Sequence, residues 1–308
     1  MSRTAVVALT LLAAVPACKT AKGVDIEASA LVPKDASLVI GFELSALSAS
    51  PVGGTLASSM GADPETKALF AGFENCEVDL EHLKALVAGS FTSETYMAVI
   101  ESPGLGEESV VRCIEKEIAK AMGDSSSGII MFETKGDVRI TPQEGGGHLI
   151  ILNKNAIVIA DAPWDDTVLE AIENADKRNT DGPMATMMKD VGGDTDVWMA
   201  ATVGPMERAE FAEVPGATTL ESVLMKVGLG DGMKLDASFG FTAESDAGQF
   251  RSAVPALIGM AKPELPSAGL PADLLDNLEF GGEGNAVTAT WAIKADVLPG
   301  LVTTLGAL

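Results

Sequence analysis

The chain has 308 residues, of which 47% are apolar, and this is enough to fill one large core or two modest ones. Its net charge of -23 repels nucleic acid and anionic lipid headgroups, and its aromatic content of 5% does not suit a nucleic-acid stacking platform. We therefore expect no nucleic-acid partner and no electrostatic reason for the folded part to lie flat on a membrane.

The N-terminus has the features of an export signal. An apolar run follows Arg3, and Val15 and Ala17 occupy the places, three and one residues before the cut, where a signal peptidase requires small residues. The run has about ten residues and is too short for a permanent membrane helix, which needs about 20. We expect residues 1–17 to be removed, so that the mature chain begins at Cys18.

The stretch Val15-Pro16-Ala17-Cys18 resembles the lipobox of bacterial lipoproteins, with proline as an unusual occupant of its position. The resemblance implies that Cys18 carries two or three acyl chains, which is enough for stable membrane anchoring. Residues 18–31 would then be the acylated cysteine and a short polar tether. Because Lys19 is not the aspartate that favours inner-membrane retention, the outer membrane is favoured over the inner membrane. The alternative is an ordinary secreted protein with a chance cysteine.

If Cys18 carries lipid, Cys76 and Cys113 remain, and an oxidising compartment favours one disulfide between them. Cys113 would lie at the inner edge of a helix, and Cys76 in a loop before it. Such a bridge would stabilise the fold by about 4 kcal/mol. Two separate buried thiols are the alternative. The spacing does not match a redox CxxC pair or a zinc knuckle.

The body of the chain is predicted to form two units, 32–178 and 196–308, joined by a polar linker at 179–195. In the first unit we expect strands at 36–44, 84–91, 94–101, 129–133, 138–141, 148–152 and 156–160, and helices at 45–51, 107–122 and 165–175. In the second unit we expect strands at 197–203, 233–242 and 286–293, and helices at 219–227, 245–260, 271–278 and 296–305.

The two units have a similar order of elements. In each, a strand leads into a helix with an acidic start, at Glu107 and Glu108 in the first and at Ser245 and Asp246 in the second. We interpret this as a diverged duplication. The predicted fold class is α+β, with two similar units of antiparallel sheet and helices packed on one face. The alternative is two stretches of ordinary α+β sequence without a common origin.

Several structural motifs resemble a group of uncharacterised bacterial cell-envelope lipoproteins with a duplicated α+β body. These are the opening Val32-Pro33-Lys34-Asp35-Ala36, the strand into Phe42, the break at Ser50 and Pro51, and the pair Cys76 and Cys113. The resemblance covers most of the first half and is looser in the second. It implies location and architecture, and it transfers no catalytic residue because the group has no assigned reaction.

The sequence offers little material for catalysis. His82 lies in a polar turn and His148 at a strand start, and no G-x-S-x-G elbow accompanies them. The aspartate pairs at 165–166 and 194–196 do not extend into a calcium-binding spacing, so capping and solubility explain them more simply. We therefore predict no enzyme activity, no cofactor and no bound metal.

The glycine-rich stretch 228–232 is predicted to end the helix at 219–227 in a left-handed cap. A phosphate loop would require the order strand, glycines, helix, which is the reverse of the predicted order. Thr218 and Glu221 fit a capping box at the start of that helix.

Met184, Met187 and Met188 form a cluster beside the linker. On a helix the first would share a face with one or both of the others, which suits packing in the core. If the cluster is exposed, its adaptable side chains are the candidate contact surface for an apolar partner. Core packing is the favoured interpretation.

The leading hypothesis is a non-enzymatic, lipid-anchored envelope protein that acts by binding or scaffolding, with another envelope protein as its partner. The alternative is a periplasmic carrier or chaperone that holds an apolar ligand between the two units, with Trp198 or Trp291 in the cleft. An envelope hydrolase that uses carboxylates alone is the least favoured hypothesis.

Overall fold

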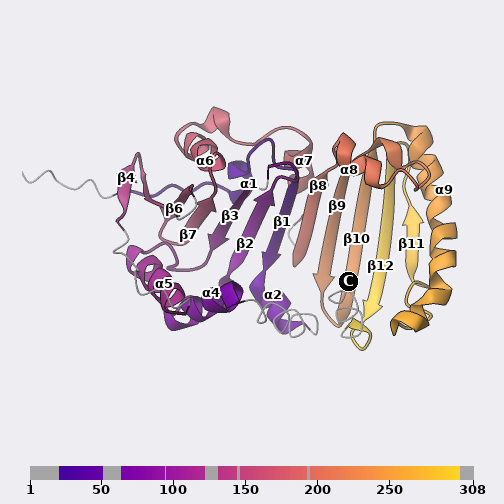
Figure 1. The fold of residues 1–308 in the computed structure, drawn as a ribbon, viewed down its shortest axis with the longest axis horizontal. Coiled ribbons are helices and arrows are strands. Elements are labelled where there is room, and N and C mark those ends of the chain that lie inside the picture. Colours follow the sequence, from indigo (N-terminus) through magenta and orange to yellow (C-terminus); the bar gives the residue numbers. More distant parts are fainter. Residues whose placement is uncertain are drawn as a thin grey trace, which may run out of the picture.

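The computed structural model describes residues 21–50, 64–93, 95–121, 131–143, 146–192 and 195–298. These residues form one sheet of twelve strands in the order β11-β12-β10-β9-β8-β1-β2-β3-β7-β6-β5-β4 (Figure 1). Every pairing of neighbouring strands is antiparallel. The predicted α+β class is confirmed, and the two units share a single continuous sheet.

The first half contributes seven of these strands and the helices around them. The strands are β1 (Leu38–Glu43), β2 (Lys84–Gly89), β3 (Tyr96–Glu101), β4 (Glu133–Lys135), β5 (Val138–Pro142), β6 (His148–Asn153) and β7 (Ala156–Ala160). The helices are α1 (Ala28–Leu31), α2 (Leu44–Ala49), α4 (Pro64–Asn75), α5 (Glu108–Ala121), α6 (Trp164–Glu173) and α7 (Pro183–Lys189), with short 3₁₀ turns η1 (Leu80–His82) and η2 (Ala175–Lys177).

The second half contributes five strands. They are β8 (Val197–Thr202), β9 (Leu220–Leu229), β10 (Gly232–Phe241), β11 (Leu278–Gly281) and β12 (Ala286–Lys294). The helices are α8 (Pro205–Glu210) and α9 (Glu244–Ala261), with 3₁₀ segments η3 (Ala217–Thr219) and η4 (Lys262–Ala268).

The two halves follow the same topological plan. Each has three consecutive antiparallel strands, β1 to β3 and β8 to β10, and continues into a long helix, α5 or α9. A later strand, β7 or β12, then pairs with the third strand. The halves meet where β1 pairs with β8, from Leu38 opposite Ala201 to Phe42 opposite Val197. We call this pairing the seam.

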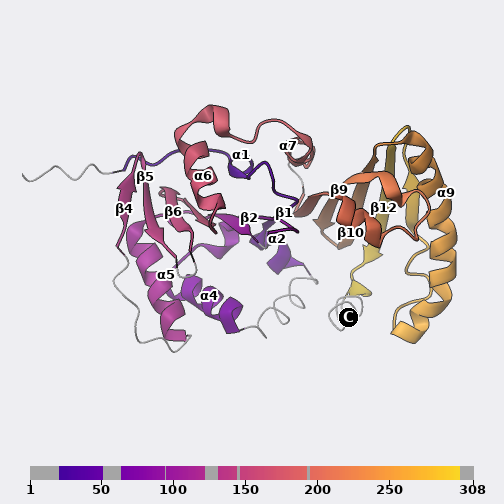
Figure 2. The same ribbon diagram turned by 45° about the horizontal axis from the view of Figure 1, so that its top comes forward.

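Helices cover both faces of the sheet in the first half, which corrects the prediction of helices on one face there (Figure 2). α4 and α5 pack on one face, whereas α1, α6 and α7 pack on the other. The reason lies in β6 and β7, which are apolar on both faces: Ile150 is 0% exposed and its neighbour Ile151 is 6% exposed. A strand that is apolar on both faces requires cover on both. In the second half the polar face, with Thr288 and Thr290, is exposed.

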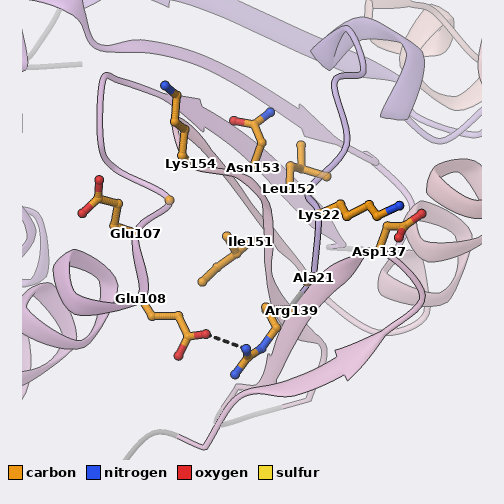
Figure 3. A pocket seen from close by; sticks show the side chains of 12 residues that line it. Ala21, Lys22, Glu107, Glu108, Asp137, Arg139, Ile151, Leu152, Asn153 and Lys154 are labelled. Carbon is orange, nitrogen blue, oxygen red and sulfur yellow. Dashed lines mark ion pairs between the residues drawn. The ribbon is translucent and has the colours of Figure 1, made fainter. Parts of the chain in front are cut away.

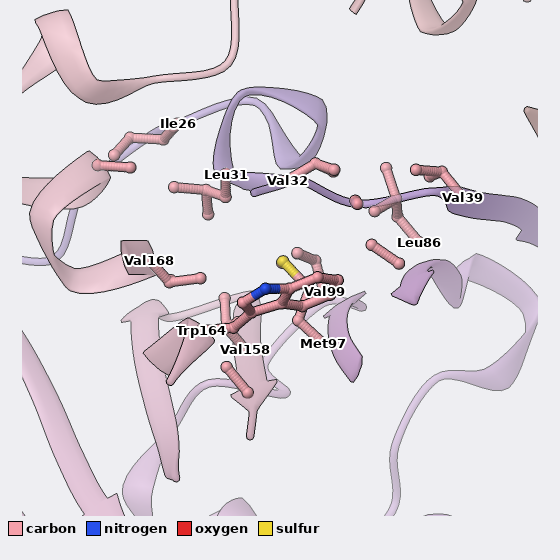
Figure 4. Packing of buried hydrophobic residues seen from close by; sticks show 14 of the residues in the cluster. Ile26, Leu31, Val32, Val39, Leu86, Met97, Val99, Val158, Trp164 and Val168 are labelled. Carbon is pink, nitrogen blue, oxygen red and sulfur yellow. The ribbon is translucent and has the colours of Figure 1, made fainter. Parts of the chain in front are cut away.

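The N-terminal segment is part of the core, so the polar tether predicted for residues 18–31 is too long. Val24 donates a backbone hydrogen bond to the carbonyl of Leu152, 2.7 Å away. Ile26 and Leu31 are buried in the same cluster as Trp164 (Figure 4). In the sequence these apolar residues lie among charged ones, so no periodic pattern predicts their burial. They are buried because they pack on apolar residues of the sheet face beneath them. Residues 18–20 lie outside the described residues.

The prediction of a helix at 219–227 is wrong, because this segment is the long strand β9. Its apolar residues Val223, Met225 and Val227 alternate with other residues, the period of a strand, and pair with both β8 and β10. The glycines at 228–232 turn the chain into β10 and cap no helix. The predicted capping box at Thr218 and Glu221 is therefore also wrong, because residues 220–229 form a strand.

Other boundaries also differ from expectation. Residues 271–277 form turns and not a helix, and β11 follows them. β4 lies at 133–135, later than the expected 129–133, and α1, α4 and α8 were not predicted. Most of the predicted helix at 296–305 lies outside the described residues. In the ranges that the structure covers, no helix has the length and apolarity needed to cross a bilayer.

Candidate functional site

The structure contains the Cys76–Cys113 disulfide, with the two Cα atoms 5.8 Å apart. It joins the end of α4 to α5, and Cys76 is buried in the cluster between these helices and the sheet. Its place inside a packed core makes the bridge structural. The predicted lipidation site, Cys18, lies outside the described residues.

The methionine cluster is not a surface. Met184, Met187 and Met188 are 4%, 8% and 9% exposed, and all three pack from α7 into the large core beside α1 and α6. The favoured interpretation, core packing, is confirmed, and the alternative of an exposed contact surface is wrong. The helix in the linker region places these side chains in one cluster with Ala200 and Leu224 of the sheet. Residues 179–192 of the predicted linker, 179–195, form a packed connection, and residues 193 and 194 lie outside the described residues.

The histidines contact carboxylates. Nδ1 of His148 lies 2.7 Å from Oδ2 of the buried Asp165, and Nδ1 of the exposed His82 lies 2.8 Å from Oδ2 of Asp79. Within the described ranges no hydroxyl or thiol is hydrogen-bonded to either ring, and no group of three or more candidate ligands could hold a metal ion. Asp196 accepts a hydrogen bond from the backbone of Leu229, and Asp194 lies outside the described residues.

A band of partly exposed apolar side chains crosses the seam on the face of the sheet that carries α5 and α9. Directly paired residues point to the same face of a sheet, so the strand register identifies its members. They are Leu38, Ile40 and Phe42 of β1, Val87 of β2, Val197 and Met199 of β8, Met225 and Val227 of β9, and Leu235 of β10. We call this band the central apolar strip.

Two packed regions border the central apolar strip. On one side, Ala85 and Ile100 belong to the cluster beneath α4 and α5. On the other side, Phe239 packs with α9, and Trp291, which is paired with Leu235, packs with Leu274 and Ile293. None of the nine strip residues belongs to a packed cluster of described residues. The sheet is thus covered at both ends and partly exposed between them.

The opposite face of the seam has a cleft of about 290 Å³, lined in part by Gly41, Lys84, Glu101 and Trp198. Burial raises the pKa of Glu101 above its ordinary value, and the nearby Lys84 opposes that shift. The cleft is small and carries charges, so it suits a polar ligand better than an apolar one.

A second cavity, of about 260 Å³, lies where the N-terminal segment meets the hairpin of β6 and β7 (Figure 3). It is lined by three basic side chains, Lys22, Arg139 and Lys154, and three acidic ones, Glu107, Glu108 and Asp137. We call it the N-terminal pocket. No periodicity in the sequence predicts it, because its walls come from four separate segments.

Comparison with known proteins gives a likeness in fold alone. No protein-family model and no curated protein matches the chain. Among solved structures, crystal form I of TP0453 has a TM-score of 0.54 and 10% identity, covering 92% of this chain and 98% of TP0453. Crystal form IV of TP0453 has a TM-score of 0.52 and 11% identity, covering 91% and 97%. The likeness in fold therefore extends over both halves of the chain.

Proposed function

We propose that this chain is a non-enzymatic, lipid-anchored protein of the bacterial cell envelope, with the outer membrane favoured, and that it acts by binding an apolar ligand on the central apolar strip. The observation that carries the proposal is the strip itself. Nine apolar side chains remain partly exposed between two well-packed regions of one sheet face. Contiguous apolar surface of this kind commonly marks a binding site.

The composition of the strip indicates the class of ligand. It contains aliphatic side chains, two methionines, Met199 and Met225, and one aromatic residue, Phe42, and none of its nine side chains is charged. From ordinary strand spacing, five strands and five residues along β1 give a surface of about 19 by 13 Å. A long acyl chain fits such a surface, because it gains free energy from contact area and needs no hydrogen bonds.

The lipid anchor and the lack of enzymatic activity rest on separate support. The sequence around Cys18 resembles a lipobox, and a bilayer anchor would hold the strip near a supply of acyl chains. The contacts of His148 and His82 with carboxylates, and with no hydroxyl or thiol in the described ranges, support the non-enzymatic interpretation.

The test is a titration of the purified full chain carrying Cys18→Ser with a dansyl-labelled fatty acid, followed by dansyl fluorescence. We expect saturable binding, weakened about tenfold or more in the double variant Met199→Asn/Val227→Asn, because buried amides without partners disfavour contact with an acyl chain. Thr288→Asn/Thr290→Asn, on the exposed polar face, is the matched control and should bind as the parent does.

Circular dichroism must first show that both double variants are folded. Absence of saturable binding, or equal weakening in both double variants, would reject the strip as the site. In that case a single envelope protein, cross-linked in near-equal amount to the anchored form and lost with Cys18→Ser, would support a scaffold instead.

A further inference from the structure

The N-terminal pocket lies beside the first described residues of the chain, 21–23. The amide of Gly23 donates to the carbonyl of Asp137 at 2.9 Å, and the side-chain amide of Asn153 donates to the carbonyl of Val24 at 2.9 Å. These bonds hold residues 23 and 24 against the turn between β4 and β5 and against the end of β6. Because only five residue steps separate Gly23 from Cys18, an extended chain places the cysteine at most about 17 Å away.

One basic side chain of this pocket has a buried donor without a partner in the described part of the chain, and two others are exposed without an ion pair there. Nη1 of Arg139 lies 2.8 Å from Oε1 of Glu108, but Nε of Arg139 is buried without a hydrogen-bond partner. Lys22 and Lys154 are exposed, and neither ammonium has an ion-pair partner among the residues that the structure describes. A buried donor without a partner is unfavourable and is commonly satisfied by a ligand or water.

Acidic groups stand beside these cations. Figure 3 shows Glu107 on one side of the pocket, Asp137 next to Lys22 on the other, and Arg139 paired with Glu108 below. Glu107 and Asp137 are exposed carboxylates that line the same cavity. The lining therefore provides partners for both an anionic and a cationic group, although the chain as a whole has a net charge of -23.

We propose that the N-terminal pocket binds a zwitterionic headgroup in which a phosphate diester is joined by a short linker to an ammonium group. The phosphate would be held by Arg139, Lys154 and Lys22, and the ammonium by Glu107 or Asp137, through charge-assisted hydrogen bonds. The headgroup is neutral, so the acidic surface of the protein does not repel it. Its source is the membrane that carries the anchor, and this part rests on the proposed lipidation of Cys18.

The full chain with Cys18→Ser provides the test, because its binding does not depend on acylation. It is titrated by calorimetry with glycerophosphoethanolamine, and separately with inorganic phosphate and with ethanolamine. We expect glycerophosphoethanolamine to bind most tightly, and Lys22→Glu and Lys154→Glu each to weaken it about fivefold or more. Lys294→Glu, an exposed lysine on β12, makes the same change in charge and should have no effect.

Three outcomes of the titration would overturn the proposal: no binding of glycerophosphoethanolamine, equal binding of inorganic phosphate alone, or equal weakening by Lys294→Glu. Vesicles then distinguish the source of the headgroup. Sedimentation of the unanchored chain with phosphatidylethanolamine vesicles, and not with uncharged galactolipid vesicles, supports a membrane headgroup. Binding of glycerophosphoethanolamine without sedimentation with the vesicles would reject the membrane as the source of the headgroup. The mass of the mature protein tests lipidation separately. If Cys18 is not acylated, the result of the titration is unchanged, because the titrated chain carries Cys18→Ser.

Discussion

Gly41 and Trp198 are directly paired across the seam, and the indole ring of Trp198 lies against the backbone of Gly41, where the Cβ of any other residue would overlap it. The glycine therefore allows the ring to lie flat on the sheet at the junction of the two halves. Since β1 and β8 provide the only strand pairing that joins the halves in the described sheet, this contact stabilises the continuous sheet.

We predict that Gly41→Ala destabilises the protein by about 1–3 kcal/mol, because the added methyl group forces the ring or the strand to shift. Urea unfolding, followed by circular dichroism, measures the change. Gly228→Ala on β9 is the control, because no atom lies within 4 Å of the position of its Cβ. If the two variants are equally stable, the Gly41–Trp198 contact does not constrain the seam.

The disulfide gives a second prediction. In a Cys18→Ser background, replacing Cys76 and Cys113 together by alanine should lower the free energy of unfolding by about 4 kcal/mol, as expected for closing a loop of this length in the unfolded chain. Thermal unfolding with and without reductant provides the measurement. Reductant should destabilise the parent protein and leave the double variant unchanged. A parent protein insensitive to reductant would contradict the prediction.

The raised pKa of Glu101 predicts that the stability of the fold depends on pH. Burial raises its pKa in the folded state, so its contribution to stability is complete below the unfolded-state pKa of about 4.5 and is lost as pH rises through the folded-state value. Glu101→Gln should therefore be more stable than the parent at pH 7, with the difference shrinking toward pH 4. Urea unfolding at the two pH values measures it. Glu264→Gln, an exposed carboxylate, controls for the change in net charge.

The mass of the mature protein tests the anchor. We predict an N-terminus at Cys18 that carries two or three acyl chains, and a Cys18→Ser form found in the soluble fraction. Mass spectrometry of the N-terminal peptide, with fractionation of the two forms, provides the measurement. A mature N-terminus without acyl mass would mean an ordinary secreted protein.

Local patterns in the sequence predicted much of the fold. Strands β2 and β3 and helices α5 and α9 lie within a few residues of their expected positions, because each pattern is strongly periodic over its own length. β9 was mistaken for a helix because Leu220, Leu224 and Val227 also fit a helical spacing. The segment forms a strand because it pairs with β8 and β10, and both of these partners are separate segments of the chain.

Composition and short-range spacing are sufficient to predict the α+β class, the acidic surface and the candidate anchor at Cys18. Three further features appear in the folded protein and in no local pattern: the two halves share one sheet, the cluster of Met184, Met187 and Met188 is buried, and nine apolar residues from five strands form the central apolar strip. The physical reason is that strand register and helix docking are contacts between distant segments. No local pattern specifies which distant segment completes a surface or a pocket.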